Sequence, residues 1–566
     1  MNKNKLFILD FLRKNYHSNH RSVIFLCGSH SWSYKVATHF LSLFSKSSKK
    51  CWFGNINASY LKNISNLQII NLLNKQKIIG TDIDLMVIDG WSGLSPNLLG
   101  LASGTLKGGS VLLILLPDIV NLISFKDPFL ENFKSKRPYQ YEMHNNFLKR
   151  LFHKISLDKI NENAFRVIYE TNKLEIKNEL ILFSKFYESE RNQIDKNKNF
   201  IPNIDQQNII ESMRNLYNSS NGIVYINADR GRGKTVSLAL GVCGLLKDLK
   251  KNIIITAPNR LNVKNFFDVL DRESHKIKFF PVDKLISQYE SCQNNFIENR
   301  ILIVDEAAAF PLSILKKLTK IFKKIIFSTT VEGYEGSGRG FAINFKRTLS
   351  KIDPLFRSLS LSLPLRWSDL DPVEDFFKDL LIMSDEKFII NPSIDFKIEN
   401  MKVHLIDQYT LSINESLLIK IYSLLVSSHY QTRPDDLRMI LDAPYLRLWI
   451  ATIGDFSEYN IIGVLLVTEE GGFNNTQDGL YLDQVVKNQR RPRGNLLTQL
   501  MTSHSGDQTW SKLSSLRIMR IAVHMKYRKR GIATHLLNAL EFYAIRKHYS
   551  FLSVTFGFSS DIYDFW

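Results

Sequence analysis

Residues 222–235 read GIVYINADRGRGKT, a stretch that predicts an α/β fold with a phosphate-binding loop. Gly222–Ala228 has the apolar, β-branched composition of a buried strand, and Val236–Leu249 has that of an apolar helix. Glycines between a strand and a helix let backbone N–H groups close around phosphate oxygens, and the helix N-terminus favours the negative charge. Ala228 stands where the pattern G-x-x-x-x-G-K-[ST] has its first glycine, so a basic strand–helix turn is the alternative for this segment alone.

Two pairs of residues carry the expected chemistry of this region. Lys234 is expected to reach the outer phosphates, and the Thr235 hydroxyl is expected to ligate magnesium. Downstream, Ile301–Phe310 (ILIVDEAAAF) is an apolar strand that ends in two acids. Asp305 would hold the magnesium ion, and Glu306 would act in catalysis by orienting the attacking water. Acids are also common at helix starts, but their order after the loop favours the catalytic interpretation.

The next predicted strand, Ile325–Thr330, ends in hydroxyl side chains that could sense the γ-phosphate. Beyond it lies the glycine-rich loop 333–341, GYEGSGRGF, which contains Arg339. An arginine in such a loop can act as a finger on the γ-phosphate. It can equally contact RNA phosphate or be a solvated turn residue, and the residues themselves leave these roles open.

A second strand–loop–helix unit lies further along the chain. Leu516–Met525 is strand-like, Thr534–Lys547 is helix-like, and the loop between them carries the pattern R-x-x-G-x-A. The unit resembles the pyrophosphate loop of the GNAT superfamily of N-acetyltransferases, where backbone N–H groups at a helix N-terminus hold the pyrophosphate of coenzyme A. This resemblance implies that the exposed edge of Ile521–Val523 pairs with the pantetheine amides, and that Phe551–Phe558 forms the next strand.

Two histidines, His429 and His524, are candidates for the general base of an acyl transfer. A histidine at the end of a strand is also commonly a packed structural residue. The sequence does not choose between these roles for either side chain.

The composition limits the class of protein. The chain has 566 residues, 44% of them hydrophobic and 11% aromatic, which is enough for several folded domains. Lys and Arg number 74 against 55 Asp and Glu, and the net charge of +19 indicates a polyanionic partner or an anionic membrane surface. The alternative explanation for this positive charge is a genome composition that enriches lysine. The four cysteines lack zinc spacing and no apolar run could span a bilayer, so we expect a cytoplasmic protein.

Apolar β-branched runs alternate with amphipathic stretches, as in parallel sheets covered by helices. In the first region, buried strands are expected at Ser22–Cys27, Leu85–Asp89 and Ser110–Leu116. The polar segment Tyr187–Asp205 is expected to be a linker.

The order of the motifs resembles that of the tRNA(Met) cytidine acetyltransferase family. The resemblance covers about residues 205–566, and it extends more loosely to 89–117. The motifs that carry it are RGRGKT (230–235), DEAAAFP (305–311), GYEGSGRGF (333–341), PLRWSDLDPVE (364–374), SHYQTRPDDLRMILDAP (428–444), RRPRGNLL (490–497) and RIAVHMKYRKRGIATHLL (520–537).

The resemblance implies three domains and two ligand sites. The domains are an N-terminal α/β domain over 1–190, a RecA-like P-loop ATPase domain over 200–375 and a GNAT-type acetyltransferase domain over 376–566. Nucleotide contacts are implied at Gln206, Ala228, Asp229, Arg230, Gly231, Arg232, Gly233, Lys234, Thr235, Asp305 and Arg339. Acetyl-CoA contacts are implied at Ile521, Ala522, Val523, Arg528, Lys529, Arg530, Gly531, Ile532, Ala533 and Thr534.

Members of that family acetylate N4 of the wobble cytidine in elongator tRNA(Met), using acetyl-CoA while they hydrolyse ATP or GTP. The expected ligands are therefore acetyl-CoA, ATP or GTP, and Mg²⁺. The expected partner is tRNA, and neither DNA nor a membrane is expected to bind.

Several positions depart from the family pattern. Asp229 places an acid inside the phosphate loop, where repulsion is expected to weaken nucleotide binding. Met525 and Ala533 stand where proline and glycine are common. Family members continue into a tail implicated in tRNA binding, whereas this sequence ends at Trp566. Either the protein is reduced, or its RNA affinity comes from the rest of its surface, including basic runs such as Arg490–Arg493.

Two other functions remain open. One is an RNA-remodelling ATPase with a vestigial acetyltransferase domain. The sequence contains only one RecA-like core, which is evidence against this function. The other is a nucleotide-regulated protein acetyltransferase, which would not need a charge of +19.

Overall fold

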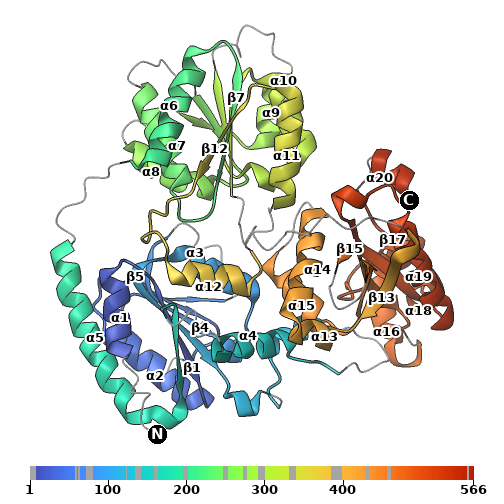
Figure 1. Ribbon diagram of the computed structural model, residues 1–566, viewed down its shortest axis with the longest axis horizontal. Helices are drawn as coiled ribbons and strands as arrows, with labels where there is room; N and C mark the ends of the chain where they lie inside the picture. Colours follow the sequence, from blue (N-terminus) through green and yellow to red (C-terminus); the bar gives the residue numbers. More distant parts are fainter. Residues whose placement is uncertain are drawn as a thin grey trace.

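The computed structural model describes residues 8–57, 60–61, 64–71, 81–122, 124–133, 142–157, 163–194, 202–246, 253–271, 277–290, 300–330, 339–383, 398–428, 433–454, 460–473, 475–557 and 560–566. These residues form three β-sheets, each surrounded by helices and each built from a different third of the chain (Figure 1). The multidomain α/β fold expected from the sequence is confirmed.

The N-terminal region is a parallel sheet in the order β3-β2-β4-β5-β1-β6. β1 and β4 are buried along their whole lengths, as expected for parallel strands with helices on both faces. Its elements are α1 (Ile8–His17), β1 (Ser22–Cys27), α2 (His30–Ser42), β2 (Lys50–Phe53), β3 (Leu67–Ile70), β4 (Ile83–Asp89), α3 (Pro96–Thr105), β5 (Leu106–Leu116), α4 (Asn146–Leu157), β6 (Phe165–Tyr169) and α5 (Lys173–Ile194).

The middle region is a second parallel sheet, in the order β12-β7-β11-β10-β8-β9. The carboxyl ends of β7, β10 and β11 lie at one edge, which is where ligands bind in open α/β sheets. Its elements are α6 (Ile204–Asn218), β7 (Gly222–Ala228), α7 (Lys234–Leu246), β8 (Ile253–Thr256), α8 (Lys264–Leu270), β9 (Lys278–Phe279), α9 (Val282–Glu290), β10 (Ile301–Val304), α10 (Leu312–Ile321), β11 (Lys324–Thr330), α11 (Arg339–Ile352) and β12 (Arg357–Leu361).

The C-terminal region is a mixed sheet in the order β13-β14-β15-β16-β17, antiparallel except for the last pair. Its elements are β13 (Met401–Ile406), α13 (Gln408–Ile413), α14 (Glu415–Ser428), α15 (Pro434–Asp442), β14 (Leu446–Ile453), β15 (Ile461–Gly471), α16 (Asn475–Val486), α17 (Leu496–Ser505), α18 (Thr509–Lys512), β16 (Ser514–Val523), α19 (Ile532–Arg546), β17 (Phe551–Val554) and α20 (Ser560–Phe565).

One helix, α12 (Pro372–Leu380), follows the middle sheet but packs elsewhere. In Figure 1 it lies below that sheet and beside α3 of the N-terminal region. Its Phe376 and Phe377 belong to one apolar core that also contains Phe25 of the N-terminal sheet and Leu425 of the C-terminal region. The N-terminal and C-terminal regions therefore share a core, whereas the middle sheet has apolar cores of its own.

The predicted linker Tyr187–Asp205 is partly wrong. Residues up to Ile194 continue α5, and Ile204 begins α6, while 195–201 lie outside the described residues. Tyr187 is buried and its hydroxyl donates to Asp84 Oδ1 at 2.8 Å, so packing against the first sheet holds this polar sequence in a helix. None of the helices in the described ranges is long and apolar enough to cross a membrane.

Candidate functional site

The phosphate-binding loop lies between the end of β7 at Ala228 and the start of α7 at Lys234, as the sequence predicts. Gly231 and Gly233 have φ values of +80° and +75°, in the left-handed region that favours glycine. A Cβ on Gly231 would lie 2.6 Å from the Trp367 ring, and one on Gly233 would collide with Leu365. Both glycines are therefore required by backbone conformation and by close packing.

Lys234 is the centre of a buried polar cluster. Its Nζ donates to Glu306 Oε1 at 2.7 Å and to Thr330 Oγ1 at 3.0 Å, and it lies 3.6 Å from Asp305 Oδ1. Burial alone would lower the pKa of Lys234, but the charges of Glu306 and Asp305 outweigh it and raise the pKa. Glu306 has φ +50° and ψ +47°, an uncommon conformation that is concentrated at functional sites.

Thr235 and Asp305 lie close enough to share one metal ion. Thr235 Oγ1 donates to Asp305 Oδ2 at 3.2 Å, and Asp305 Oδ1 accepts from Ser328 Oγ at 2.8 Å. Within the described ranges, no group of three or more His, Cys, Asp or Glu side chains could hold a metal ion. Hydroxyl and carboxylate oxygens nevertheless fit Mg²⁺, which takes most of its ligands from phosphates and water at such sites.

Gln206 lies behind the loop in the first turn of α6 and is fully buried. Its Oε1 accepts from the Asn203 backbone N–H, and its Nε2 donates to Ser237 Oγ, each at 3.1 Å. The first bond caps α6, and the second ties its first turn to α7. Direct contact between Gln206 and a nucleotide stays a prediction.

Asp229 has a counter-cation that the sequence does not reveal. Its Oδ2 lies 3.4 Å from Nζ of Lys378, on α12. Lys378 also lies 3.0 Å from Glu374 Oε1, whose other neighbour is the guanidinium of Arg232. The neighbouring Arg230 is half-buried. Lys378 thus offsets part of the negative charge of Asp229, and weakened nucleotide binding stays a prediction.

Arg339 is the first residue of α11, and the glycine-rich residues 333–338 before it lie outside the described ranges. Its role on a γ-phosphate stays a prediction. Further along α11, Arg347 Nη2 lies 3.5 Å from Met525 Sδ, in the loop that follows β16 of the third sheet.

The second site lies where β16 and β17 part. β16 pairs with β17 from Ser515 to Ile518, and the paired register ends there. On the other edge, His524 N–H donates to Ile462 O at 2.8 Å. Because N–H groups alternate between the two edges of a strand, those of Val523 and Ile521 face the side that β17 has left. This edge fits the predicted contact with pantetheine amides at Ile521, Ala522 and Val523.

The loop after β16 presents positive charge and backbone N–H groups. Arg528, Lys529 and Arg530 are exposed, and Lys529 has φ +61°. Gly531, with φ +79°, is the N-cap of α19, whose first N–H groups at Ile532, Ala533 and Thr534 have no partner within the helix. Arg528 Nε donates to Val523 O at 3.1 Å and so closes the loop onto the strand. The arrangement suits an anion such as pyrophosphate.

Of the two candidate bases, His524 lies within the described residues and His429 lies outside them. His524 follows Val523 directly, and its buried Nδ1 makes no hydrogen bond among the described residues. Burial, with the charges of Lys526 and Arg528, lowers the pKa of His524, which favours the neutral imidazole. His429 lies outside the described residues and stays a prediction.

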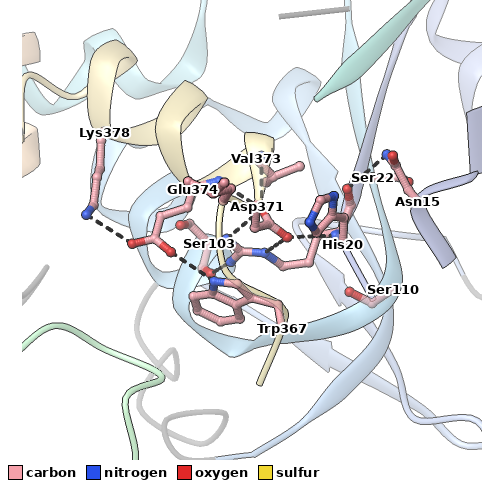
Figure 2. Close-up of polar contacts among 12 residues, drawn as sticks. Asn15, His20, Ser22, Ser103, Ser110, Trp367, Asp371, Val373, Glu374 and Lys378 are labelled. Carbon is pink, nitrogen blue, oxygen red and sulfur yellow. Dashed lines mark hydrogen bonds and ion pairs between the residues drawn. The ribbon is translucent and has the colours of Figure 1, made fainter. Parts of the chain in front are cut away.

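Segment 364–374 is the part of the site that sequence reasoning missed. It contacts the phosphate loop through Trp367, and the Trp367 Nε1–H group donates to Glu374 Oε2 at 2.8 Å (Figure 2). The motif PLRWSDLDPVE was visible in the sequence, but nothing in its residue types indicated a role at the nucleotide site.

Comparison with known proteins identifies the family. Family models match at 1–160 (tRNA(Met) cytidine acetyltransferase TmcA, N-terminal), at 225–384 (RNA cytidine acetyltransferase NAT10/TcmA, helicase domain) and at 420–549 (GNAT acetyltransferase 2). A tRNA(Met) cytidine acetyltransferase TmcA from Haemophilus influenzae is 30% identical over 526 residues, covering 86% of this chain and 73% of the relative. The chain belongs to the tRNA(Met) cytidine acetyltransferase TmcA family. Its helicase-type domain implies nucleotide binding, and its GNAT domain implies use of acetyl-CoA.

Other matches agree with that family. TmcA from Nitrosococcus halophilus is 28% identical over 566 residues, covering 97% of this chain and 72% of the relative. Among solved structures, an aminoglycoside acetyltransferase from an uncultured soil metagenomic sample covers 30% of this chain and 85% of its own, at 15% identity and a TM-score of 0.20. A similarity this slight carries no argument about the site.

Proposed function

We propose that this chain forms N4-acetylcytidine at the wobble position of elongator tRNA(Met), using acetyl-CoA and the hydrolysis of ATP or GTP. The observation that carries the proposal is the pairing of two sites in one chain. The Lys234–Glu306–Thr330 cluster suits a nucleotide, and the parted strands above the Gly531 loop suit an acetyl-CoA molecule. A chain of the TmcA family with both sites intact is equipped for both reactions.

In the acetyl-donor site, the exocyclic amine of cytosine would attack the thioester carbonyl. A C–N bond forms, the C–S bond breaks, and coenzyme A leaves as the thiolate, which takes up a proton. The cytosine amine is a poor nucleophile because its lone pair is delocalised into the ring, so orientation and proton removal matter. The Val523 N–H group faces the developing oxyanion, and neutral His524 accepts the proton from nitrogen, directly or through water.

In the nucleotide site, Lys234 and the loop N–H groups bind the phosphates, while Thr235 and Asp305 would hold Mg²⁺. That ion supplies positive charge to the phosphates when it is bound. Glu306 orients the attacking water. The thioester is already activated, so nucleotide hydrolysis is not needed to drive acyl transfer. We propose that it remodels the anticodon loop so that the cytidine can leave the stack and enter the acetyl site.

Nucleoside mass spectrometry tests the whole proposal. Purified chain, acetyl-CoA, ATP and tRNA(Met) are incubated together, and the digested RNA is expected to contain N4-acetylcytidine at one position. Isotope-labelled acetyl-CoA separates the rival function, because label in protein and none in RNA would indicate a protein acetyltransferase. ATP turnover without any acetyl transfer would instead indicate an RNA-remodelling ATPase.

The pH dependence of acetyl transfer tests whether His524 is the general base. Only the neutral imidazole of His524 accepts a proton, so acetyl transfer is expected to fall as pH drops through a pKa below the usual 6.5. His524→Gln is expected to slow transfer about 10²-fold, at the low end of what a positioned general base contributes, because water can take part of its role. The exposed His504 in α17 gives the control His504→Gln, which should keep the wild-type profile. An unchanged acid limb in His524→Gln would remove His524 from this role.

The salt dependence of RNA binding tests the basic run Arg490–Arg493. Arg490 and Arg491 are exposed, whereas Arg493 Nη1 donates to Glu131 O at 3.3 Å and to Asn132 Oδ1 at 3.4 Å. Replacing Arg490 and Arg491 with glutamine spares that docking contact. The double variant is expected to lower the slope of log affinity against log salt by about 1–2. It should weaken the binding of unrelated RNAs to a similar extent. A loss confined to tRNA(Met) would make the arginines base readers.

A further inference from the structure

Segment 364–374, here called the bridging segment, leads from β12 to the first turn of α12 and contacts the phosphate loop at several of its residues. The Leu365 N–H group donates to Gly231 O at 2.9 Å, and the Leu365 side chain occupies the space that a Cβ on Gly233 would need. The Trp367 ring packs in the same way against Gly231. The two flexible glycines of the loop are thus held from one side by two side chains of this segment.

The same segment is anchored to the N-terminal region on its other side. The Gly108 N–H group donates to Arg366 O at 2.6 Å, and Arg366 Nη1 donates to Gly104 O at 2.5 Å. The Ser368 N–H group donates to Asn19 O at 3.1 Å. These bonds connect elements more than 250 residues apart, and they fix the backbone on both sides of Trp367.

A buried ion pair lies at the centre of these contacts, and Figure 2 shows its acid, Asp371, near Trp367 and Glu374. Arg21, the residue before β1, and Asp371 are both fully buried, and Arg21 Nη2 lies 3.0 Å from Asp371 Oδ1. The Arg21 backbone N–H also donates to Asp371 Oδ2 at 2.8 Å. The Arg21 guanidinium stacks on the Trp367 ring, 3.5 Å from its centroid. At the edge of the same ring, the Trp367 Nε1–H group donates to Glu374 Oε2.

Glu374 connects Trp367 to the phosphate loop. One of its carboxylate oxygens accepts from Trp367 and the other from Arg232, a loop residue that is itself buried. Burial favours the neutral acid, but the hydrogen bond from Arg232 and the charges of Arg232 and Lys378 outweigh it and lower the pKa of Glu374 to about 2. Glu374 is therefore ionised, and the link to Arg232 is intact, throughout the physiological pH range.

We propose that Arg21 of the N-terminal region and Trp367 are positioning residues of the nucleotide site, so that the N-terminal region sets the conformation of the phosphate loop. The inference rests on the proposed nucleotide hydrolysis. In this proposal both side chains act through the phosphate loop rather than on the nucleotide itself. They hold Gly231 and Arg232 in place, and a loop that is ordered before its ligand arrives loses less entropy on binding.

Two variants and a matched control test this inference in the full chain. Trp367→Phe keeps an aromatic ring but removes the N–H donor to Glu374. Arg21→Lys keeps the charge but loses the planar, bidentate contact and the stacking. Arg438→Lys is the control, because Arg438 is equally buried and paired, with Asp127 and Asp442, yet its partners lie away from the phosphate loop.

Both test variants are expected to raise KM for ATP about tenfold with a smaller change in kcat, as for a lost hydrogen bond to a charged group. Acetyl-CoA affinity should not change in either variant. Arg438→Lys should lower Tm about as much as Arg21→Lys does while keeping the wild-type KM for ATP. Addition of ATP should change tryptophan emission in wild type, and Trp367→Phe should lose most of that change, although six other tryptophans remain.

The outcomes separate this inference from the function on which it rests. A wild-type chain that neither binds nor hydrolyses ATP would overturn the proposed function and the inference with it. A wild-type chain that hydrolyses ATP, together with test variants whose KM matches that of Arg438→Lys, would overturn the inference alone. An emission change that persists in full in Trp367→Phe would likewise show that Trp367 does not follow the state of the loop.

Discussion

Replacing Lys234 with alanine is expected to reduce ATP hydrolysis about 10³-fold, because the variant lacks the buried ammonium that faces the outer phosphates. The structure adds a second reason for a large effect. Lys234 lies 2.7 Å from Glu306 Oε1 and 3.6 Å from Asp305 Oδ1, so it is the counter-cation of both acids. Without it, the two carboxylates repel each other and the incoming phosphates. Steady-state phosphate release measures the loss, and acetylation of tRNA is expected to fall with it.

Two further variants make the result specific. Lys320→Ala removes an exposed lysine of α10 and should leave ATP hydrolysis unchanged. Glu306→Gln should keep nucleotide binding and lose hydrolysis, because the amide still bonds to Lys234 and Thr330 but orients water poorly. Wild-type acetylation of tRNA by Lys234→Ala would show that the nucleotide site is not coupled to the acetyl transfer.

Several of the strands and the two loops were predictable because their signals are local. Ser22–Cys27 and Gly222–Ala228 are continuous apolar runs, and the structure places β1 and β7 at those residues. Lys234 and Asp305 were assigned from their motifs, and Thr330 as a hydroxyl at the end of a predicted strand. The parallel sheet brings the three together because its carboxyl ends share one edge. In such a sheet, a residue that directly follows a strand lies at the edge where the site forms.

The contacts that tune the site were not predictable, because their partners are far apart in sequence. Lys378, which offsets the charge of Asp229, lies 149 residues away on a helix packed against another domain. Tyr187 begins a polar stretch, yet its burial against Asp84 continues α5 where a linker was expected. Trp367 belongs to a motif of ordinary residue types. Its role depends on Arg21, almost 350 residues earlier, and tertiary packing alone brings the two together.

Gly531→Glu is expected to weaken acetyl-CoA binding about 10²- to 10³-fold while ATP binding is preserved. Gly531 has φ +79° and caps α19 at its N-terminus, where the backbone must approach a pyrophosphate. Its Cβ would already lie 3.3 Å from Ile398 Cδ1, so the new side chain has little room on that side. A carboxylate placed about 4 Å from a phosphate costs about 4 kcal/mol at the effective dielectric of a protein surface, and partial screening by salt gives the expected range.

Gly506→Glu is the matched control for this variant. Gly506 has nearly the same backbone conformation, φ +70°, at the C-terminal end of α17, and a Cβ there would meet no atom of the described residues within 4 Å. Both variants carry the cost of a left-handed non-glycine residue, about 1–2 kcal/mol, and both add one negative charge. A difference in acetyl-CoA affinity, measured by calorimetry, therefore reports the phosphate site and not the strain. Equal affinities in the two variants would mean that the Gly531 loop does not bind the pyrophosphate, and the acetyl donor would then need another site on the third sheet.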